Sequence, residues 1–141
     1  MLSIVDSVQN SYDDNFIVVK IPVSQAHDLV SSILKEFSQY ERVLLVSNDM
    51  DWARGISENV HLAKYEKKDY VVYTPEYFEE KYGFYPTNEA VVLYKTFRGD
   101  DSDNIPKGVP GIRENVLIRL IEDYDSLKEI LKEIDEISYL G

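Results

Sequence analysis

The apolar residues of this chain form short continuous runs that predict β-strands. A run of about four to eight apolar residues, bounded by turn residues, is typical of a strand buried in a sheet. The expected strands cover residues 16–23, 43–46, 60–65 and 70–73. The first two runs are almost wholly apolar, which indicates strands that are buried in the fold.

Apolar residues spaced three and four apart predict amphipathic helices. We expect a short helix over residues 1–9 and further helices over residues 24–37, 75–82, 87–97, 113–124 and 126–137. Thr74 is a suitable N-cap followed by proline, and Gly83 is a suitable end for the same helix. The last helix carries a regular apolar stripe, for which we expect an ordinary packing role. This order predicts an α/β fold, with a partial parallel sheet and flanking helices, followed by an all-helical region.

Composition narrows the class of protein further. The length of 141 residues suits one domain, and 44% hydrophobic residues suffice for a core. The absence of cysteine excludes disulfides and thiolate zinc sites and fits a cytoplasmic protein. No apolar run approaches the roughly 20 residues of a membrane helix, and the N-terminus lacks a signal-peptide pattern, so we expect no membrane partner.

Paired aspartates occur at two places and are candidate metal ligands. Asp49 and Asp51 directly follow the expected strand 43–46, where α/β folds bind ligands, and an extended chain would direct both side chains to one side. Asp100 and Asp103 would share a face if Asp100 opens a helical turn. Clustered carboxylates repel one another, and Mg²⁺ or Mn²⁺ would remove that cost. Taken singly, each aspartate also suits a cap or turn.

A rigid loop follows the second pair of aspartates. It contains Pro106, Gly108, Pro110 and Gly111 and leads into a helix. Backbone N–H groups at such a turn form an anion site suited to phosphate, which would hold DNA without reading its sequence. Taken alone, a Pro/Gly loop of this kind is more often a plain connection between helices. Candidate cations for this site are Lys107, Arg113 and Arg119.

These segments together closely resemble the 5′-nuclease family of flap endonucleases, phage 5′-to-3′ exonucleases and the nuclease domain of bacterial DNA polymerase I. Residues 99–112 are similar to the family signature Gly-Asp-x-Ser-Asp-Asn-Ile-Pro-Gly-Val-Pro-Gly-Ile. Residues 46–51 resemble its Ser-Gly-Asp-x-Asp motif, and residues 74–83 resemble its Thr-Pro-Glu and Lys-Tyr-Gly segment. The resemblance covers roughly residues 16 to 135.

The resemblance implies a PIN-like α/β core over residues 1–97 and a helix–three-turn–helix (SAM-like) DNA-binding region over residues 98–141. It implies that catalytic metal ligands of the second-site type lie at Asp49, Asp51, Asp100 and Asp103. Among the acids of a further motif it leaves only Asp28, as another metal ligand. Mg²⁺ or Mn²⁺ is the implied cofactor, with K⁺ in the hairpin loop by family analogy. The implied DNA contacts are Lys107, Gly108, Gly111, Arg113 and Arg119.

The chain also departs from the family pattern. Gln25 and His27 stand where the family's Glu-Ala-Asp-Asp motif has acids, and the early strands and helical arch have no counterpart here. After Ile112 the family has a second glycine and a basic residue, whereas this chain continues with Arg113 and Glu114. The net charge of -11 also disfavours DNA binding unless basic residues cluster locally, bound cations offset the acids, or binding is weak.

The departures leave two interpretations of function open. In the first, the chain is the DNA-binding carboxy-terminal half or subunit of a 5′-to-3′ exonuclease or flap endonuclease. It would bind duplex or branched 5′-flap DNA, contribute carboxylates for Mg²⁺ and be inactive alone. A separate polypeptide would then supply the missing amino-terminal half. In the second, the chain is a non-catalytic regulatory or protein-interaction descendant of the family, and it could form a homodimer through exposed sheet surface.

Overall fold

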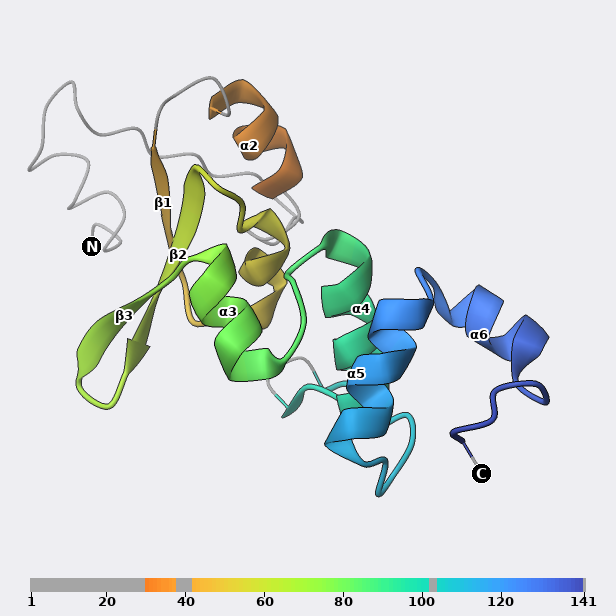
Figure 1. Ribbon diagram of the computed structural model, residues 1–141. Helices are drawn as coiled ribbons and strands as arrows, with labels where there is room; N and C mark the ends of the chain where they lie inside the picture. The colour runs from red at the N-terminus through yellow and green to blue at the C-terminus, as the bar shows by residue number, and fades with distance from the viewer. Residues whose placement is uncertain (1–29, 38–41, 102–103, 141) are drawn as a thin grey trace, which may run out of the picture.

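The computed structural model of this protein describes residues 30–37, 42–101 and 104–140, which form a small sheet and a set of helices (Figure 1). In chain order the elements are α2 (Val30–Phe37), β1 (Val43–Val46), the 3₁₀-helix η2 (Met50–Gly55), β2 (Val60–Glu66), β3 (Asp69–Tyr73), α3 (Pro75–Tyr82), α4 (Asn88–Arg98), α5 (Glu114–Asp123) and α6 (Leu127–Glu133). The helix expected at residues 1–9 and the strand expected at 16–23 lie outside the described residues. The other expected strands and helices are confirmed, α2 over its described residues and several with shifted ends.

The sheet is mixed, so the expectation of a parallel sheet is only partly right. Its strand order is β1-β2-β3, with β1 parallel to β2 and β2 antiparallel to β3. The cause is the connection between β2 and β3, which consists of only Lys67 and Lys68. Both residues have positive φ, 50° and 71°. A two-residue connection of this kind closes a hairpin, whereas a parallel pair requires a long crossover.

One face of the sheet packs on the helices and the other is open within the described part of the chain. Leu45, Leu62 and Tyr73 are buried on the helix-covered face. Successive strand residues alternate between faces. On the other face the small Ala63 is buried, whereas the large side chains are exposed: Leu44, Val46, Tyr65, Tyr70 and Val72. The prediction that strand 43–46 is fully buried is therefore wrong. The continuous apolar run covers one buried and one open face.

Side-chain caps set the helix starts as the sequence predicts. The Oγ1 atoms of Thr74 and Thr87 accept from the N–H groups of Tyr77 and Ala90, at 3.2 and 3.1 Å. Helix α3 ends at Gly83. The last helix ends at Glu133 rather than at residue 137. Its apolar stripe is only partly packed, with Ile130 and Ile137 buried and the others exposed, namely Leu127, Leu131 and Ile134.

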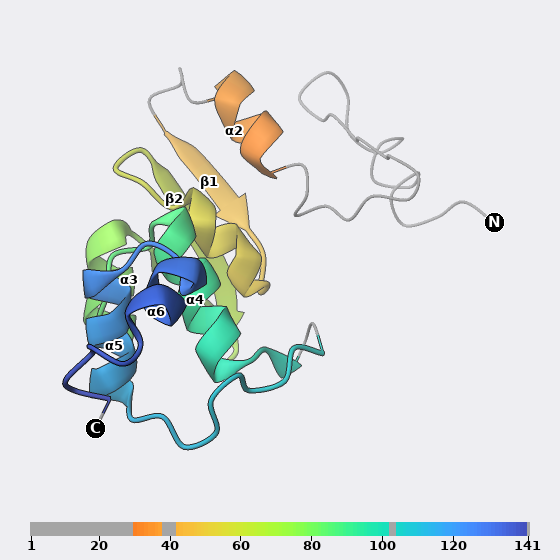
Figure 2. The same ribbon diagram turned by 90° about the vertical axis from the view of Figure 1, so that its right-hand side faces the viewer.

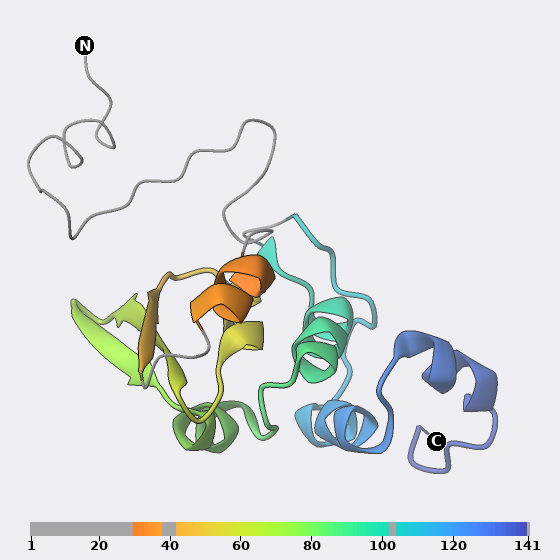
Figure 3. The same ribbon diagram turned by 90° about the horizontal axis from the view of Figure 1, so that it is seen from above.

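A single hydrophobic cluster connects the sheet with the helices that follow it. The cluster includes Leu62 from β2, Phe78 from α3, Val91 from α4, Leu117 from α5 and Ile130 from α6. Figure 3 shows α4 and α5 between the sheet and α6, which lies at the end of the molecule opposite the sheet. The α/β and helical segments thus share one core in the described residues, and α4 passes through its middle.

Candidate functional site

The turn after β1 is joined to β2 by side-chain hydrogen bonds. Asn48 accepts from the Tyr65 N–H at 2.7 Å and donates to the Tyr65 carbonyl at 3.4 Å, so its amide continues the sheet beyond Val46. Asp49 then caps η2, because its Oδ1 accepts from the Asp51 N–H at 2.8 Å. The prediction of an extended Asp49–Asp51 segment is therefore wrong. A capping aspartate favours helical turns directly after itself.

Asp51 and Asp100 meet at the side chain of Lys95. The Lys95 Nζ atom lies 2.7 Å from Oδ1 of Asp51 and 3.0 Å from Oδ2 of Asp100. Lys95 is only 7% exposed, and both carboxylates are largely buried as well. A buried ammonium of this kind is stable only when carboxylates compensate its charge. The structure thus joins the two expected aspartate motifs through a cation.

Lys95 was not among the residues that the sequence indicated. It lies on α4 among apolar positions, four residues after the buried Val91 and two before the buried Phe97. A lysine on the apolar stripe of a helix is the signal that could have identified it, since lysine is almost never fully buried unless it is paired. Lys95 lies in the last turn of α4, so its ammonium reaches the turn that carries Asp100.

A tight turn holds Asp100 beside the end of α4. Asp100 and Ile105 exchange two backbone hydrogen bonds, of 2.8 and 2.9 Å, and Asn104 has a φ of 55°. Gly99 has a φ of 76° and a ψ of 174°, a conformation that is essentially restricted to glycine. Asp103 lies outside the described residues, so its expected position beside Asp100 stays a prediction.

The described residues do not form a metal site by themselves. Residues 30–37, 42–101 and 104–140 contain no group of three or more His, Asp or Glu side chains placed to hold an ion. The donor chemistry is suitable, because carboxylate oxygens are the ligands that Mg²⁺ and Mn²⁺ prefer. Lys95, however, takes an oxygen of each of two candidate ligands. The remaining candidate Asp28, with His27 and Gln25, lies outside the described residues.

A second lysine approaches the aspartates from β2. Lys64 is half-buried, and burial lowers its pKa, while the charges of Glu66, Asp100 and Asp49 act in the opposite direction. Its Nζ atom lies 3.9 Å from Oε1 of Glu66 and 5.4 Å from the ring centre of Tyr73. Lys64 therefore connects the aspartates electrostatically with a neighbouring polar cluster on the sheet.

That cluster consists of Glu66, Tyr73 and Lys81. The buried Tyr73 hydroxyl donates to Glu66 and accepts from Lys81, whose Nζ atom also lies 2.9 Å from Oε2 of Glu66. Burial, followed by the hydrogen bond to Glu66, raises the pKa of Tyr73. The hydrogen bonds from Tyr73 and Lys81 lower the pKa of Glu66. The Tyr73 hydroxyl and the Lys81 ammonium therefore both stabilise the ionised form of Glu66.

We expect the substitution Glu66→Gln to lower the free energy of unfolding at pH 7 by about 1 kcal/mol, because it removes a partly solvent-screened charged acceptor. The folded-state pKa of Glu66 is lowered, so this contribution is present above the unfolded-state value of about 4.3 and is lost as the pH falls through the lower folded-state value. Urea unfolding at pH 7 and pH 3.5 measures the difference, with the exposed Glu79→Gln as control. A difference that stays constant between these pH values would contradict it.

The loop after the turn lies on the end of α4. A Cβ atom on Gly108 would lie 2.4 Å from the Thr96 carbonyl oxygen, so the loop backbone touches the helix. Lys107 and Arg113 are exposed on this loop, on either side of Gly108 and Gly111. Figure 2 shows the loop leaving the lower end of α4 and returning to the lower end of α5. The sequence-predicted phosphate contacts at the loop are thus accessible.

Arg119 is placed differently from the other two candidate cations. It lies on α5, 4.0 Å from Asp123, and its guanidinium stacks 4.3 Å from the ring centre of Tyr139.

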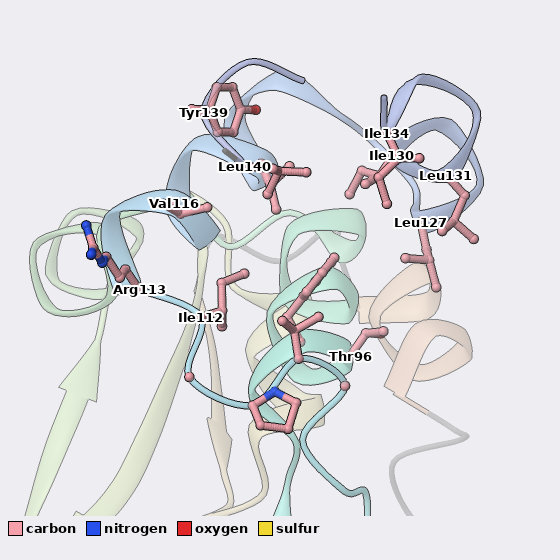
Figure 4. Close-up of a pocket in the computed structure, with 16 residues that line it drawn as sticks. Thr96, Ile112, Arg113, Val116, Leu127, Ile130, Leu131, Ile134, Tyr139 and Leu140 are labelled. Carbon is pink, nitrogen blue, oxygen red and sulfur yellow. The ribbon is translucent and has the colours of Figure 1, made fainter. Parts of the chain in front are cut away.

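Next to the loop, an apolar cavity of about 780 Å³ opens between α4, α5 and the C-terminal residues (Figure 4). The partly exposed stripe of α6 lines this cavity, which explains why that stripe is not buried.

Comparison with known proteins finds homologues among 5′-3′ exonucleases and DNA polymerases I. Over 118 residues the chain is 37% identical to DNA polymerase I of Bacillus subtilis, and over 117 residues it is 35% identical to a 5′-3′ exonuclease of Buchnera aphidicola subsp. Schizaphis graminum. This chain is a homologue of the 5′-nucleases. The resemblance seen in the sequence is thereby confirmed. No model of a protein family matches the sequence.

The 5′-nuclease homologue spans well under half the length of these relatives. The two matches cover 81% and 82% of this chain but 13% and 39% of the relatives. The fold agrees with solved structures of bacteriophage T5. A flap endonuclease in a pseudo-enzyme–product complex with DNA and metal ions matches with a TM-score of 0.65 and 24% identity, over 80% of this chain and 40% of that one. A T5 5′-exonuclease with bound zinc matches with a TM-score of 0.63.

The matched region is a mixed α/β fold with flanking helices. None of the helices within the described ranges is long and apolar enough to cross a lipid bilayer.

Proposed function

We propose that this chain is the DNA-binding, carboxylate-bearing part of a 5′-to-3′ exonuclease or flap endonuclease. The observation that carries the proposal is the convergence of Asp51 and Asp100 on Lys95 beside an exposed Gly/Pro loop. Two turns far apart in the sequence thus direct carboxylates to one point. Carboxylates that meet from separate turns can bind a divalent cation once further ligands join them, as in phosphodiester-cleaving sites.

The proposed DNA contact is the loop and helix start within residues 98–141. Lys107 and Arg113 supply positive charge there, and the loop backbone at Gly108 and Gly111 is exposed to solvent, where its N–H groups can meet a phosphate. Arg119, on α5, is a further proposed DNA contact, and K⁺ is the proposed occupant of the hairpin loop. The bound DNA in the T5 flap endonuclease complex supports DNA as the partner class.

The proposed cofactor is Mg²⁺ or Mn²⁺, held by Asp49, Asp51 and Asp100 together with Asp103 and Asp28. Such an ion, when bound, activates water and stabilises the leaving oxygen of a phosphodiester. Lys95 acts as the positioning residue, because it holds Asp51 and Asp100 together by charge. Asn48 holds the Asp49 turn against β2.

We propose that the chain does not cleave DNA alone. Gln25 and His27 replace family acids, so the acids of the first metal site would come from a separate polypeptide. A non-catalytic regulatory descendant is the second candidate. It is favoured by Lys95, whose ammonium pairs with two of the candidate ligands, and by the net charge of -11. This regulatory or protein-interaction candidate does not need the carboxylates for cation binding.

Fluorescence anisotropy of the full chain on a duplex and on a 5′-flap substrate tests DNA binding. We expect Lys107→Gln and Arg113→Gln each to weaken binding for all sequences and to reduce the slope of log K against log salt by about 1. Lys128→Gln on α6, an equal change of charge, is the control. Wild-type affinity in both loop variants, or no binding at low salt, would contradict the proposal.

A cleavage assay in Mg²⁺ separates the two candidates. The chain alone is expected to leave the flap substrate intact, and addition of the amino-terminal part of a homologous 5′-nuclease is expected to produce cleavage that Asp100→Ala abolishes. Cleavage that stays at the buffer level in the mixture would favour the regulatory candidate. Cleavage by the chain alone, sensitive to Asp100→Ala, would contradict inactivity in isolation.

A further inference from the structure

The tip of the β2–β3 hairpin carries an exposed pair of aromatic rings. Tyr65 and Tyr70 are 53% and 60% exposed and lie opposite each other in the antiparallel register. Their ring centroids are 5.3 Å apart with an interplanar angle of 62°. Two tyrosines at a hairpin tip bury little apolar area, so packing among the described residues does not account for both of them.

Lysines occupy the turn directly beside these rings. Lys67 and Lys68 are exposed and adopt positive φ, which favours Asn and Gly over lysine. The neighbouring acid Glu66 is engaged by Tyr73 and Lys81, and Asp69 accepts from the Tyr70 N–H at 2.7 Å. Counting Lys64 and Lys81, which lie beside Glu66, four lysines face two acids here, a local net charge of +2 on a chain whose net charge is -11.

The hairpin tip lies at the same end of the sheet as the aspartates. Since β1 and β2 are parallel, β2 reaches its turn at the edge where β1 leads to Asp49. The Asn48 amide binds both backbone groups of Tyr65, so the two segments are directly joined. Figure 1 shows the hairpin turn projecting beyond the helices at the lower left of the view.

We propose that Tyr65 and Tyr70, with Lys67 and Lys68, bind an unpaired segment of nucleic acid. Bases stack on the tyrosine rings, and the lysine ammonium groups contact phosphates. The inference rests on the proposed function and deepens it, since this contact is distinct from the duplex contact at Lys107 and Arg113. A protein partner fits the tip less well, because lysine is depleted in protein–protein interfaces.

The test is binding of a fluorescent oligothymidine to the full chain at low salt in EDTA, measured by anisotropy. Tyr65→Ala and Tyr70→Ala are each expected to weaken binding roughly tenfold or more, because stacking on an aromatic ring is lost. Tyr65→Phe and Tyr70→Phe keep the ring and are expected to bind like wild type. Tyr85→Ala removes another exposed tyrosine and is the matched control.

A parallel measurement on duplex DNA separates this inference from the proposed function. If the alanine variants bind oligothymidine like wild type, or if wild type does not bind it, the hairpin contact is disproved. Duplex binding that remains sensitive to Lys107→Gln would then leave the proposed function standing. Sedimentation supplies a further arm: a wild-type dimer that Tyr70→Ala converts to monomers would assign the tip to self-association and disprove the inference.

Discussion

Replacement of Lys95 by methionine is expected to lower the free energy of unfolding by about 3–5 kcal/mol in the absence of divalent cations. The side chains have similar length, so the change removes the charge with little change in volume. Two largely buried carboxylates, Asp51 and Asp100, then lose the ammonium that lies 2.7 and 3.0 Å away. Urea unfolding of both proteins in EDTA measures the effect.

The free energy of unfolding of Lys95→Met is expected to increase more on addition of divalent cations than that of wild type. Without the ammonium, oxygens of both aspartates become available to Mg²⁺ or Mn²⁺, and an ion that binds only the folded state stabilises it by mass action. At a concentration of about 100 Kd this amounts to about 2.7 kcal/mol. The proposed metal ligands thus predict a partial recovery of stability on addition of Mn²⁺.

Lys132→Met is the control for this experiment, because it makes the same chemical change at an exposed position on α6. Its effect on stability is expected to stay within about 0.5 kcal/mol, with or without Mn²⁺. If Lys95→Met is as stable as this control in EDTA, the buried ion pairs have no structural role. If it is unstable but Mn²⁺ leaves its stability unchanged, Asp51 and Asp100 do not form a cation site.

Much of the fold is predictable because its signals are local. Thr74 and Thr87 indicate where α3 and α4 begin. A threonine side chain that accepts the backbone N–H three residues later favours a helix start. Strand pairing is less predictable. The β2–β3 turn consists of Lys67 and Lys68 and lacks the Asn-Gly pattern that marks a tight hairpin, so the antiparallel pair was not expected.

The sequence indicates the acids of the candidate site but not its lysine. Asp49, Asp51 and Asp100 follow from a motif and a strand end, which are features of the sequence alone. The role of Lys95 depends on which face of α4 meets the Asp100 turn, and that contact joins segments that local patterns do not connect. The same limitation explains the wrong expectation for β1, because Leu44 and Val46 are apolar but lie on the open face.

The second large effect is expected from Gly99→Ala, which should lower the free energy of unfolding by about 3–5 kcal/mol. Gly99 combines a φ of 76° with a ψ of 174°, which a residue with a side chain strongly avoids. An added Cβ atom would also lie 2.7 Å from the Ile105 carbonyl oxygen and 2.8 Å from the Lys107 nitrogen. These are backbone atoms of the same tight turn, so relief requires the turn to open.

Gly111→Ala separates strain from contact in this experiment. Gly111 also has a positive φ, 80°, but an added Cβ atom would meet nothing within 4 Å. It is expected to cost only the conformational penalty, about 1 kcal/mol. Equal losses for the two variants, measured by urea unfolding, would mean that the close backbone contacts at Gly99 are not a constraint on the turn.

A double-mutant cycle tests whether Gly99 is coupled to the ion pair between Asp100 and Lys95. If the turn at Gly99 serves to hold Asp100 beside Lys95, then opening it already breaks that ion pair. Gly99→Ala and Lys95→Met together should then cost less than the sum of the single variants, with a coupling above about 0.5 kcal/mol, whereas Gly111→Ala and Lys95→Met should be additive. Additivity in both pairs would separate the turn from the carboxylate site. The glycine of the motif would then serve only the stability of the loop.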